Sequence, residues 1–316
     1  MQQQSGICQP DGPDESRQKG HFEAMLDLIL QTSANAIIAS SFTAIFAVGL
    51  VLIFGIAKVV NFAHGELYMA GAYTVWFLYS ENNVPFPIAV FMAIVVAVLI
   101  GLFMEVALFR WKRGDELGGL ILSVGMLMVL QVAAIHLFGQ GLMKNVTTPL
   151  KGSLQVFGMQ NFNIPYQRLL VFGVAGVSLI LLWLLLQKTR TGWALRACAD
   201  DPEAAALQGI SINRFALIAM GISAAMAGVG GAMMAPLVQV DPTMGHAVII
   251  NGLIVIIVGG VGSISGAVLA AVLFSFFHTF VTTFAGGIYA DIFGMIIMLL
   301  ILVAKPTGIM GTHAKV

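Results

Sequence analysis

Residues 188–210 read Lys-Thr-Arg-Thr-Gly-Trp-Ala-Leu-Arg-Ala-Cys-Ala-Asp-Asp-Pro-Glu-Ala-Ala-Ala-Leu-Gln-Gly-Ile, a polar stretch between two strongly apolar segments. Asp201 is a suitable N-cap, Pro202 suits the first helical position, and Glu203 suits the positive end of the helix dipole. Gly209 suits the left-handed conformation that often ends a helix. The pattern predicts a helix of about two turns with a small, Ala-rich body, suited to being held by another surface. A plain connecting loop with a well-capped helix is the alternative.

The composition of the whole chain indicates a polytopic membrane protein. Hydrophobic residues make up 59% of the 316 residues and charged residues only 9%, whereas soluble domains carry about 25% charged residues. The net charge is zero, which gives no electrostatic basis for binding nucleic acid. Cys8 and Cys198 are expected on opposite sides of the membrane, so we expect neither a disulfide nor a metal site. The chain contains no GxxxxGK[ST] pattern, and we expect a transport subunit without its own nucleotide site rather than an enzyme.

The apolar segments predict an all-α membrane bundle of about eight or nine spans, one of them short or re-entrant. Residues 1–22 are expected to form a disordered tail, and residues 23–311 a single transmembrane domain. This domain includes a polar handle, residues 188–214. An amphipathic segment at residues 21–30 is expected to lie at the membrane interface, separate from the first span. The expected spans are residues 36–56, 62–79, 86–109, 117–138, 169–187, 215–238, 247–258, 267–284 and 288–304, with a long polar connection at 139–168.

The distribution of basic residues predicts the orientation of the chain, because Lys and Arg in short loops stay in the cytoplasm. Lys58, Arg110, Arg190, Arg214 and Lys305 fall on one side if nine segments cross the membrane. We therefore expect a periplasmic N-terminus, with the handle and the C-terminus in the cytoplasm.

Two stretches combine polar or glycine-rich sequence with predicted membrane depth, at residues 58–66 and 259–266. Irregular backbone at this depth persists only inside protein or along a water-filled path. We therefore expect both stretches to line or brace a translocation route. The alternatives are tight cytoplasmic turns packed by glycine and, for Glu66, a structural ion pair with Lys58. The residues concerned are Asn61, His64, Glu66, Gly259, Gly260, Gly262 and Ser263.

Other ionisable residues lie within the predicted spans, where they are costly and often functional. Glu105 and Asp291 lie near span ends, which favours solvation at a helix terminus. His136 and His278 stand alone on apolar helices, which is typical of satisfied core histidines.

Three stretches considered together resemble one family. They are residues 61–71 (Asn-Phe-Ala-His-Gly-Glu-Leu-Tyr-Met-Ala-Gly), residues 196–210 of the handle, and residues 258–267 (Val-Gly-Gly-Val-Gly-Ser-Ile-Ser-Gly-Ala). The ending at residues 305–310, Lys-Pro-Thr-Gly-Ile-Met, is similar as well. Over about residues 25–311 the chain resembles the LivH-type permease of branched-chain amino acid ABC importers.

The resemblance implies a bacterial inner-membrane permease with a LivM-like second permease, LivG- and LivF-like ATP-binding subunits and a periplasmic substrate-binding protein. ATP and Mg²⁺ would be bound by the ATPases, with no cofactor in this chain. The implied substrates are branched-chain or other hydrophobic, neutral amino acids. A urea or short-amide importer, and a stand-alone channel or secondary transporter, are the alternatives. In this family the stretch that matches residues 196–210 couples to an ATPase, which implies a coupling role for Arg196, Asp200, Asp201, Pro202, Glu203, Ala204, Leu207 and Gly209.

Overall fold

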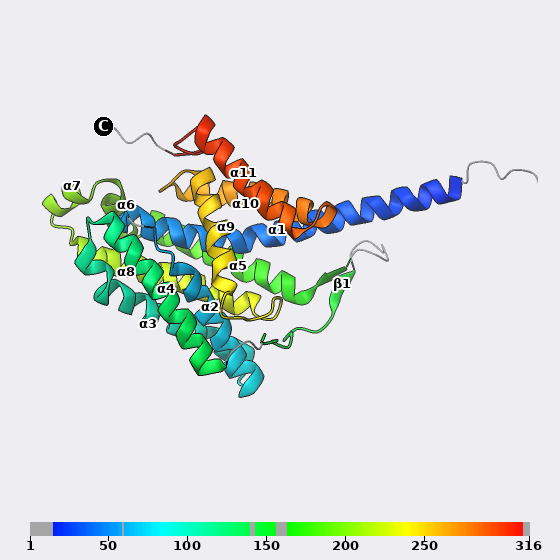
Figure 1. The fold of residues 1–316 in the computed structure, drawn as a ribbon, viewed down its shortest axis with the longest axis horizontal. Coiled ribbons are helices and arrows are strands. Elements are labelled where there is room, and N and C mark those ends of the chain that lie inside the picture. Colours follow the sequence, from blue (N-terminus) through cyan, green and yellow to red (C-terminus); the bar gives the residue numbers. More distant parts are fainter. Residues whose placement is uncertain (1–14, 59, 140–142, 156–162, 312–316) are drawn as a thin grey trace, which may run out of the picture.

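The computed structural model describes residues 15–58, 60–139, 143–155 and 163–311. Figure 1 shows a helical bundle around the long helix α1, with the N-terminal end of α1 projecting beyond the other helices. Within the described residues, seven helices are long and apolar enough to cross a membrane. They are α1 (Glu15–Ala57), α3 (Phe86–Ala107), α4 (Glu116–Phe138), α5 (Tyr166–Lys188), α8 (Ile212–Met234), α10 (Ile264–Phe284) and α11 (Gly287–Ala304).

Two further segments complete the bundle. Helix α2 (His64–Val75) continues as the π-helix η1 (Trp76–Glu81), and α9 (Met244–Gly259) is shorter than the spans around it. The predicted polytopic bundle with one short segment is confirmed, and apart from the start of α1 the predicted spans overlap the observed helices with ends shifted by a few residues.

The N-terminal helix differs from its prediction. A single helix begins at Glu15, inside the stretch assigned to a disordered tail, and continues through residues 21–30, which were expected to form a separate interfacial helix. Neither glycine nor proline interrupts the joining residues, and the hydroxyls of Thr32 and Ser33 donate to carbonyls four residues earlier at 2.7 and 2.8 Å. Because these polar groups are satisfied within the helix, the helix continues without a break. The rest of the predicted tail, residues 1–14, lies outside the described residues.

The connection between α4 and α5 contains two short antiparallel strands, β1 (Ser153–Gln155) and β2 (Asn163–Pro165), so the all-α prediction is incomplete here. The Gln31 side chain ties β2 to α1: it donates to the Asn163 carbonyl at 3.2 Å and accepts from the Asn163 amide at 3.1 Å. Nearer α4, Lys144 pairs through its backbone with Val240. The connection therefore packs along the bundle.

Small residues hold the centre of the bundle together. A side-chain carbon at Gly231 of α8 would lie 1.9 Å from the Tyr68 carbonyl oxygen of α2, and one at Gly71 would lie 2.6 Å from the Gly228 carbonyl oxygen. The most apolar window of α1 is 72% buried and that of α8 is 61% buried, against 11% for α11. Helices α1, α2 and α8 therefore form the core, and α11 presents most of its surface to lipid or to partner subunits.

Candidate functional site

The handle forms two short helices at the end of the bundle opposite the projecting end of α1, α6 (Arg190–Asp200) and α7 (Pro202–Leu207) (Figure 1). The predicted capped helix is confirmed in α7. Asp201 Oδ1 accepts from the amides of Glu203 and Ala204, each at 3.0 Å. Gly209 follows the helix with a φ of +80°, a left-handed conformation that a side chain would strain.

The sequence reasoning did not predict α6 as a separate helix. The Thr189 hydroxyl accepts from the Gly192 amide at 3.0 Å and so caps the start of α6. The capping threonine is the feature of the sequence from which this helix could have been predicted. Gly192 is needed because a side-chain carbon there would lie 2.2 Å from the Leu185 carbonyl oxygen. Cys198 is buried on the inner face of α6, and this burial raises the pKa of its thiol. Helix α6 is therefore packed against the bundle rather than freely solvated.

The outer face of the handle carries apolar side chains that nothing in the described chain covers. Leu207, at the end of α7, is 87% exposed, and Trp193 on α6 is 62% exposed. The acidic residues Asp200, Asp201 and Glu203 are exposed beside them. A fully exposed leucine on a rigid, capped helix, with charged side chains around it, is suited to insertion into a groove on another protein.

Two polar links join the handle to other helices. Lys58, in the turn after α1, donates from Nζ to the Ala199 carbonyl in the last turn of α6 at 2.8 Å. A cation is favourable at the negative end of a helix dipole. The alternative of a structural ion pair between Lys58 and Glu66 is therefore wrong, because Lys58 reaches the handle instead. Arg196 donates to Gln187 Oε1 of α5 at 3.1 Å.

A third polar link between the handle and another helix involves the buried carboxylate of Glu105. Glu105 of α3 is 1% exposed and pairs with Arg113, which also donates to Asn213 at the start of α8. The predicted solvation of Glu105 at a span end is therefore wrong. Because Asn213 lies in the last part of the handle, this link connects the handle to α3.

For the other ionisable residues of the spans, the structure also shows whether each side chain is exposed and which group it contacts. Asp291 is solvated as predicted, with a 61% exposed side chain, but it also pairs with His278 at 3.0 Å. His136 is exposed, with Nδ1 2.9 Å from the Val132 carbonyl oxygen. Neither histidine is a buried core residue.

Asn61, His64 and Glu66 are all buried near the start of α2. Asn61 Oδ1 accepts from the Ala63 amide at 3.0 Å and so forms the turn that begins the helix. Glu66 Oε1 accepts from Gln131 Nε2 of α4 at 3.1 Å. The structure thus places these three residues inside protein, as we expect for polar groups at membrane depth.

The sequence analysis did not predict that Gln131 and Ser223 belong to this polar cluster. Gln131 Nε2 lies 2.9 Å from His246 Nδ1 at the start of α9, and so links α2, α4 and α9. Ser223 of α8 donates to the Gly49 carbonyl at 2.7 Å and lies 3.4 Å from His64 Nδ1. An isolated glutamine in an apolar span was the available signal for Gln131.

The glycine-rich stretch at residues 259–266 forms a tightly packed turn. A side-chain carbon at Gly259 would lie 2.5 Å from the Gly266 carbonyl oxygen, and one at Gly260 would lie 2.4 Å from the Gly311 nitrogen. The Gly259 carbonyl also accepts from the Met310 amide at 3.0 Å. Ser263 Oγ accepts from the Gly266 amide at 3.1 Å and caps α10. This geometry matches the alternative of a packed turn, although Gly262 is exposed.

The structure does not bring the two predicted route segments together. Gly65 packs against Gly245 at the start of α9, whereas Gly259 ends that helix. A 16-residue helix is about 24 Å long, so the two segments contact opposite ends of α9.

A polytopic bundle of apolar helices with a capped, exposed handle defines a multi-pass membrane protein. The chain belongs to the family described as "Branched-chain amino acid transport system / permease component", whose model matches residues 32–304. It is thus the permease component of an ABC importer, a multi-pass protein of the bacterial inner membrane that functions with ATP-binding subunits and a substrate-binding protein.

Individual relatives agree with this assignment. The high-affinity branched-chain amino acid transport system permease protein BraD of Pseudomonas aeruginosa is 33% identical over 266 residues, covering 80% of this chain and 86% of BraD. LivH of Escherichia coli K12 is 29% identical over 274 residues, with the same coverage. The fructose import permease protein FrcC of Rhizobium meliloti is 33% identical over 116 residues, 36% of this chain and 32% of FrcC.

A solved structure shares the fold. PsaBC from Streptococcus pneumoniae, in complex with Fab, aligns with a TM-score of 0.52 at 13% identity and covers 87% of this chain and 92% of that chain. At this identity the likeness concerns the fold alone.

Proposed function

We propose that this permease passes branched-chain amino acids, or similar hydrophobic and neutral amino acids, across the inner membrane. The long matches to BraD and LivH support this substrate class, whereas the match to the fructose permease covers only 36% of the chain. The proposed complex contains a LivM-like second permease and LivG- and LivF-like ATPases, which bind ATP and Mg²⁺, and receives its substrate from a periplasmic binding protein.

The handle is the proposed docking element for an ATPase. The observation that carries this proposal is the 87% exposed Leu207 at the end of a capped helix that lies between α5 and α8. ATP-driven movement of the ATPases would reach both helices directly, and it would reach α1 and α3 through the Lys58 and Arg113 links. The proposed coupling set remains Arg196, Asp200, Asp201, Pro202, Glu203, Ala204, Leu207 and Gly209.

The proposed orientation places the handle and the C-terminus in the cytoplasm and the N-terminus in the periplasm. The handle and the start of α1 lie at opposite ends of the bundle (Figure 1), which supports this arrangement. The cluster of Asn61, His64 and Glu66 is proposed to brace the translocation route, because its hydrogen bonds join α2 to α4 and α8.

The test uses the complete importer, reconstituted in liposomes with its binding protein, and measures L-leucine uptake and ATP hydrolysis together. Leu207→Ser and Glu203→Lys are expected to abolish most of the stimulation of ATP hydrolysis by the loaded binding protein, and to abolish uptake with it. Ser211→Ala is the control, because Ser211 is exposed nearby and makes no side-chain cap hydrogen bond.

Normal stimulation and uptake in both handle variants would contradict docking by this helix. Leucine uptake by the permease without ATP would instead support a channel or secondary transporter.

A further inference from the structure

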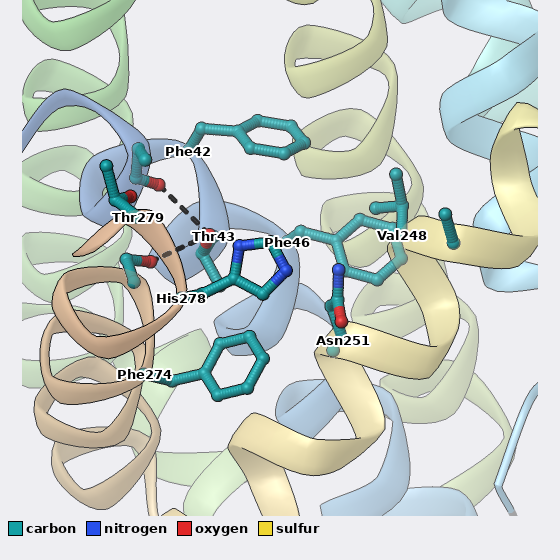
Figure 2. Close-up of a pocket in the computed structure, with 12 residues that line it drawn as sticks. Phe42, Thr43, Phe46, Val248, Asn251, Phe274, His278 and Thr279 are labelled. Carbon is teal, nitrogen blue, oxygen red and sulfur yellow. Dashed lines mark hydrogen bonds between the residues drawn. The ribbon is translucent and has the colours of Figure 1, made fainter. Parts of the chain in front are cut away.

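A second polar site lies in a pocket between α1, α9 and α10, where the Phe46 ring separates it from His64 of the α2 cluster. The pocket has a volume of about 120 Å³, room for several water molecules. Figure 2 shows the Asn251 amide and the His278 ring facing the space between Phe46 and Phe274. The lining combines apolar and polar side chains: Phe42, Phe46, Val248 and Phe274 with Thr43, Asn251, Ser275, His278 and Thr279.

The pocket extends from the middle of the bundle toward the end opposite the handle. His278 lies 14 residues after the start of α10, about 21 Å along the helix from its handle end. Thr43 lies 14 residues before the end of α1, at a similar depth. Polar side chains are uncommon within membrane helices and often serve a substrate or ion path.

Most of these polar groups are satisfied within the protein. The Ser275 hydroxyl donates to Thr43 Oγ1 at 3.1 Å, and Thr43 Oγ1 donates to the Ala39 carbonyl at 3.0 Å. His278 Nε2 lies 3.0 Å from Asp291 Oδ1 of α11, which orients the imidazole ring.

Asn251 is the exception in the pocket. Its amide has no hydrogen-bond partner among the described residues, although it can donate two hydrogen bonds and accept others. Asn251 comes from α9, the short helix, and interrupts the apolar sequence Val-Ile-Ile-Asn-Gly-Leu-Ile at residues 248–254. Asn251 is half-buried, so its unpaired amide is accessible to a molecule in the pocket.

We infer that this pocket is a recognition site on the translocation route for a neutral, zwitterionic amino acid with an aliphatic side chain. The inference rests on the proposed function and names the place where that substrate is held. The aromatic and aliphatic walls accommodate the side chain, and the Asn251 amide presents both donors and an acceptor to the charged backbone groups. Apolar walls with a few convergent polar groups are typical of small-molecule sites.

A larger groove, of about 800 Å³, lies between α1, α5, α6 and α10 beside the handle. Its deeper walls are aliphatic, and its charged residues, Arg196 and Asp200, lie at the handle. It offers no polar group comparable to Asn251 at membrane depth, so it does not match a zwitterion.

The first test is transport by the reconstituted importer with radiolabelled L-leucine. Asn251→Ala is expected to lower maximal uptake about tenfold, equivalent to the loss of one hydrogen bond in the transport step. Leucine binding to the binding protein and basal ATP hydrolysis should not change. Ile250→Ala is the matched control, because Ile250 is the neighbouring exposed residue on α9 and lies outside the pocket.

The second test reports occupancy directly and does not depend on the transport rate. In a Cys8→Ser/Cys198→Ala background, Ser275→Cys is labelled with a small methanethiosulfonate reagent during turnover, with and without L-leucine on the binding protein. Leucine should slow labelling at this position, but not at Thr283→Cys, which is exposed on α10 outside the pocket.

If the wild-type complex imports leucine but Asn251→Ala does so equally well, the pocket inference is overturned and the proposed function is not. The same holds if leucine does not protect Ser275→Cys from labelling. Failure of the wild-type complex to import leucine would overturn the proposed function, and the substrate assigned to the pocket with it.

Discussion

The handle and the contact between α2 and α8 differ in what surrounds their side chains. In the handle, local hydrogen bonds from Asp201 and Thr189 hold two short helices whose outer residues, such as Leu207, are exposed. Between α2 and α8, glycines bring the two backbones into direct contact, as Gly231 does with Tyr68 and Gly71 with Gly228. A region held by local bonds can present a surface to a partner, whereas a region held by close packing tolerates almost no change of volume.

The largest expected effect is at the packed contact, with Gly231→Leu. The added side chain would begin 1.9 Å from the Tyr68 carbonyl oxygen. The cost should exceed the roughly 1–3 kcal/mol of ordinary overpacking, because backbone cannot move aside. Size-exclusion chromatography of the detergent-solubilised complex should show loss of the monodisperse species.

Gly221→Ala on the same helix is the control, since its side-chain carbon would meet Leu102 Cδ2 at an ordinary 3.5 Å. A monodisperse Gly231→Leu complex would show that α2 and α8 are not held in this contact.

The next effect tests the buried link that connects the handle to α3. Arg113→Ala leaves the Glu105 carboxylate buried without its partner, which should cost about 3–5 kcal/mol of stability. Thermal unfolding in detergent measures this cost, and adding Glu105→Gln should recover part of it because the buried charge is removed.

Lys112→Ala is the control, because Lys112 pairs with Asp115 at 3.7 Å between exposed side chains, where a pair contributes about 0–1 kcal/mol. Equal losses for Arg113→Ala and Lys112→Ala would mean that the Glu105 carboxylate is solvated after all.

The smallest expected effect on stability is at the handle itself. Asp201→Ala removes both cap bonds of α7 and should cost about 0.5–2 kcal/mol of local helix stability. Hydrogen exchange of residues 202–208 should rise while exchange in the spans is unchanged, and ATPase stimulation should fall. Asp201→Ser, which can still cap, should restore both; failure of the serine variant would point to the charge rather than the cap.

The sequence alone was sufficient wherever a short-range rule decides the structure. The apolarity of the spans, the cap at Asp201 and the left-handed Gly209 depend on neighbouring residues, and all were predicted. The three quoted stretches also identified the family. The continuous α1 was missed because a polar run resembles a break, although hydroxyl bonds within the helix satisfy it.

Only the tertiary structure decided which polar side chains meet. Lys58 and Glu66 are eight positions apart, yet Lys58 bonds to Ala199 and Glu66 bonds to Gln131. Glu105 is buried rather than solvated, and His278 faces the same pocket as Asn251. Helical periodicity fixes the face on which a side chain lies, but the partner on that face depends on how distant helices pack, and no local rule contains that information.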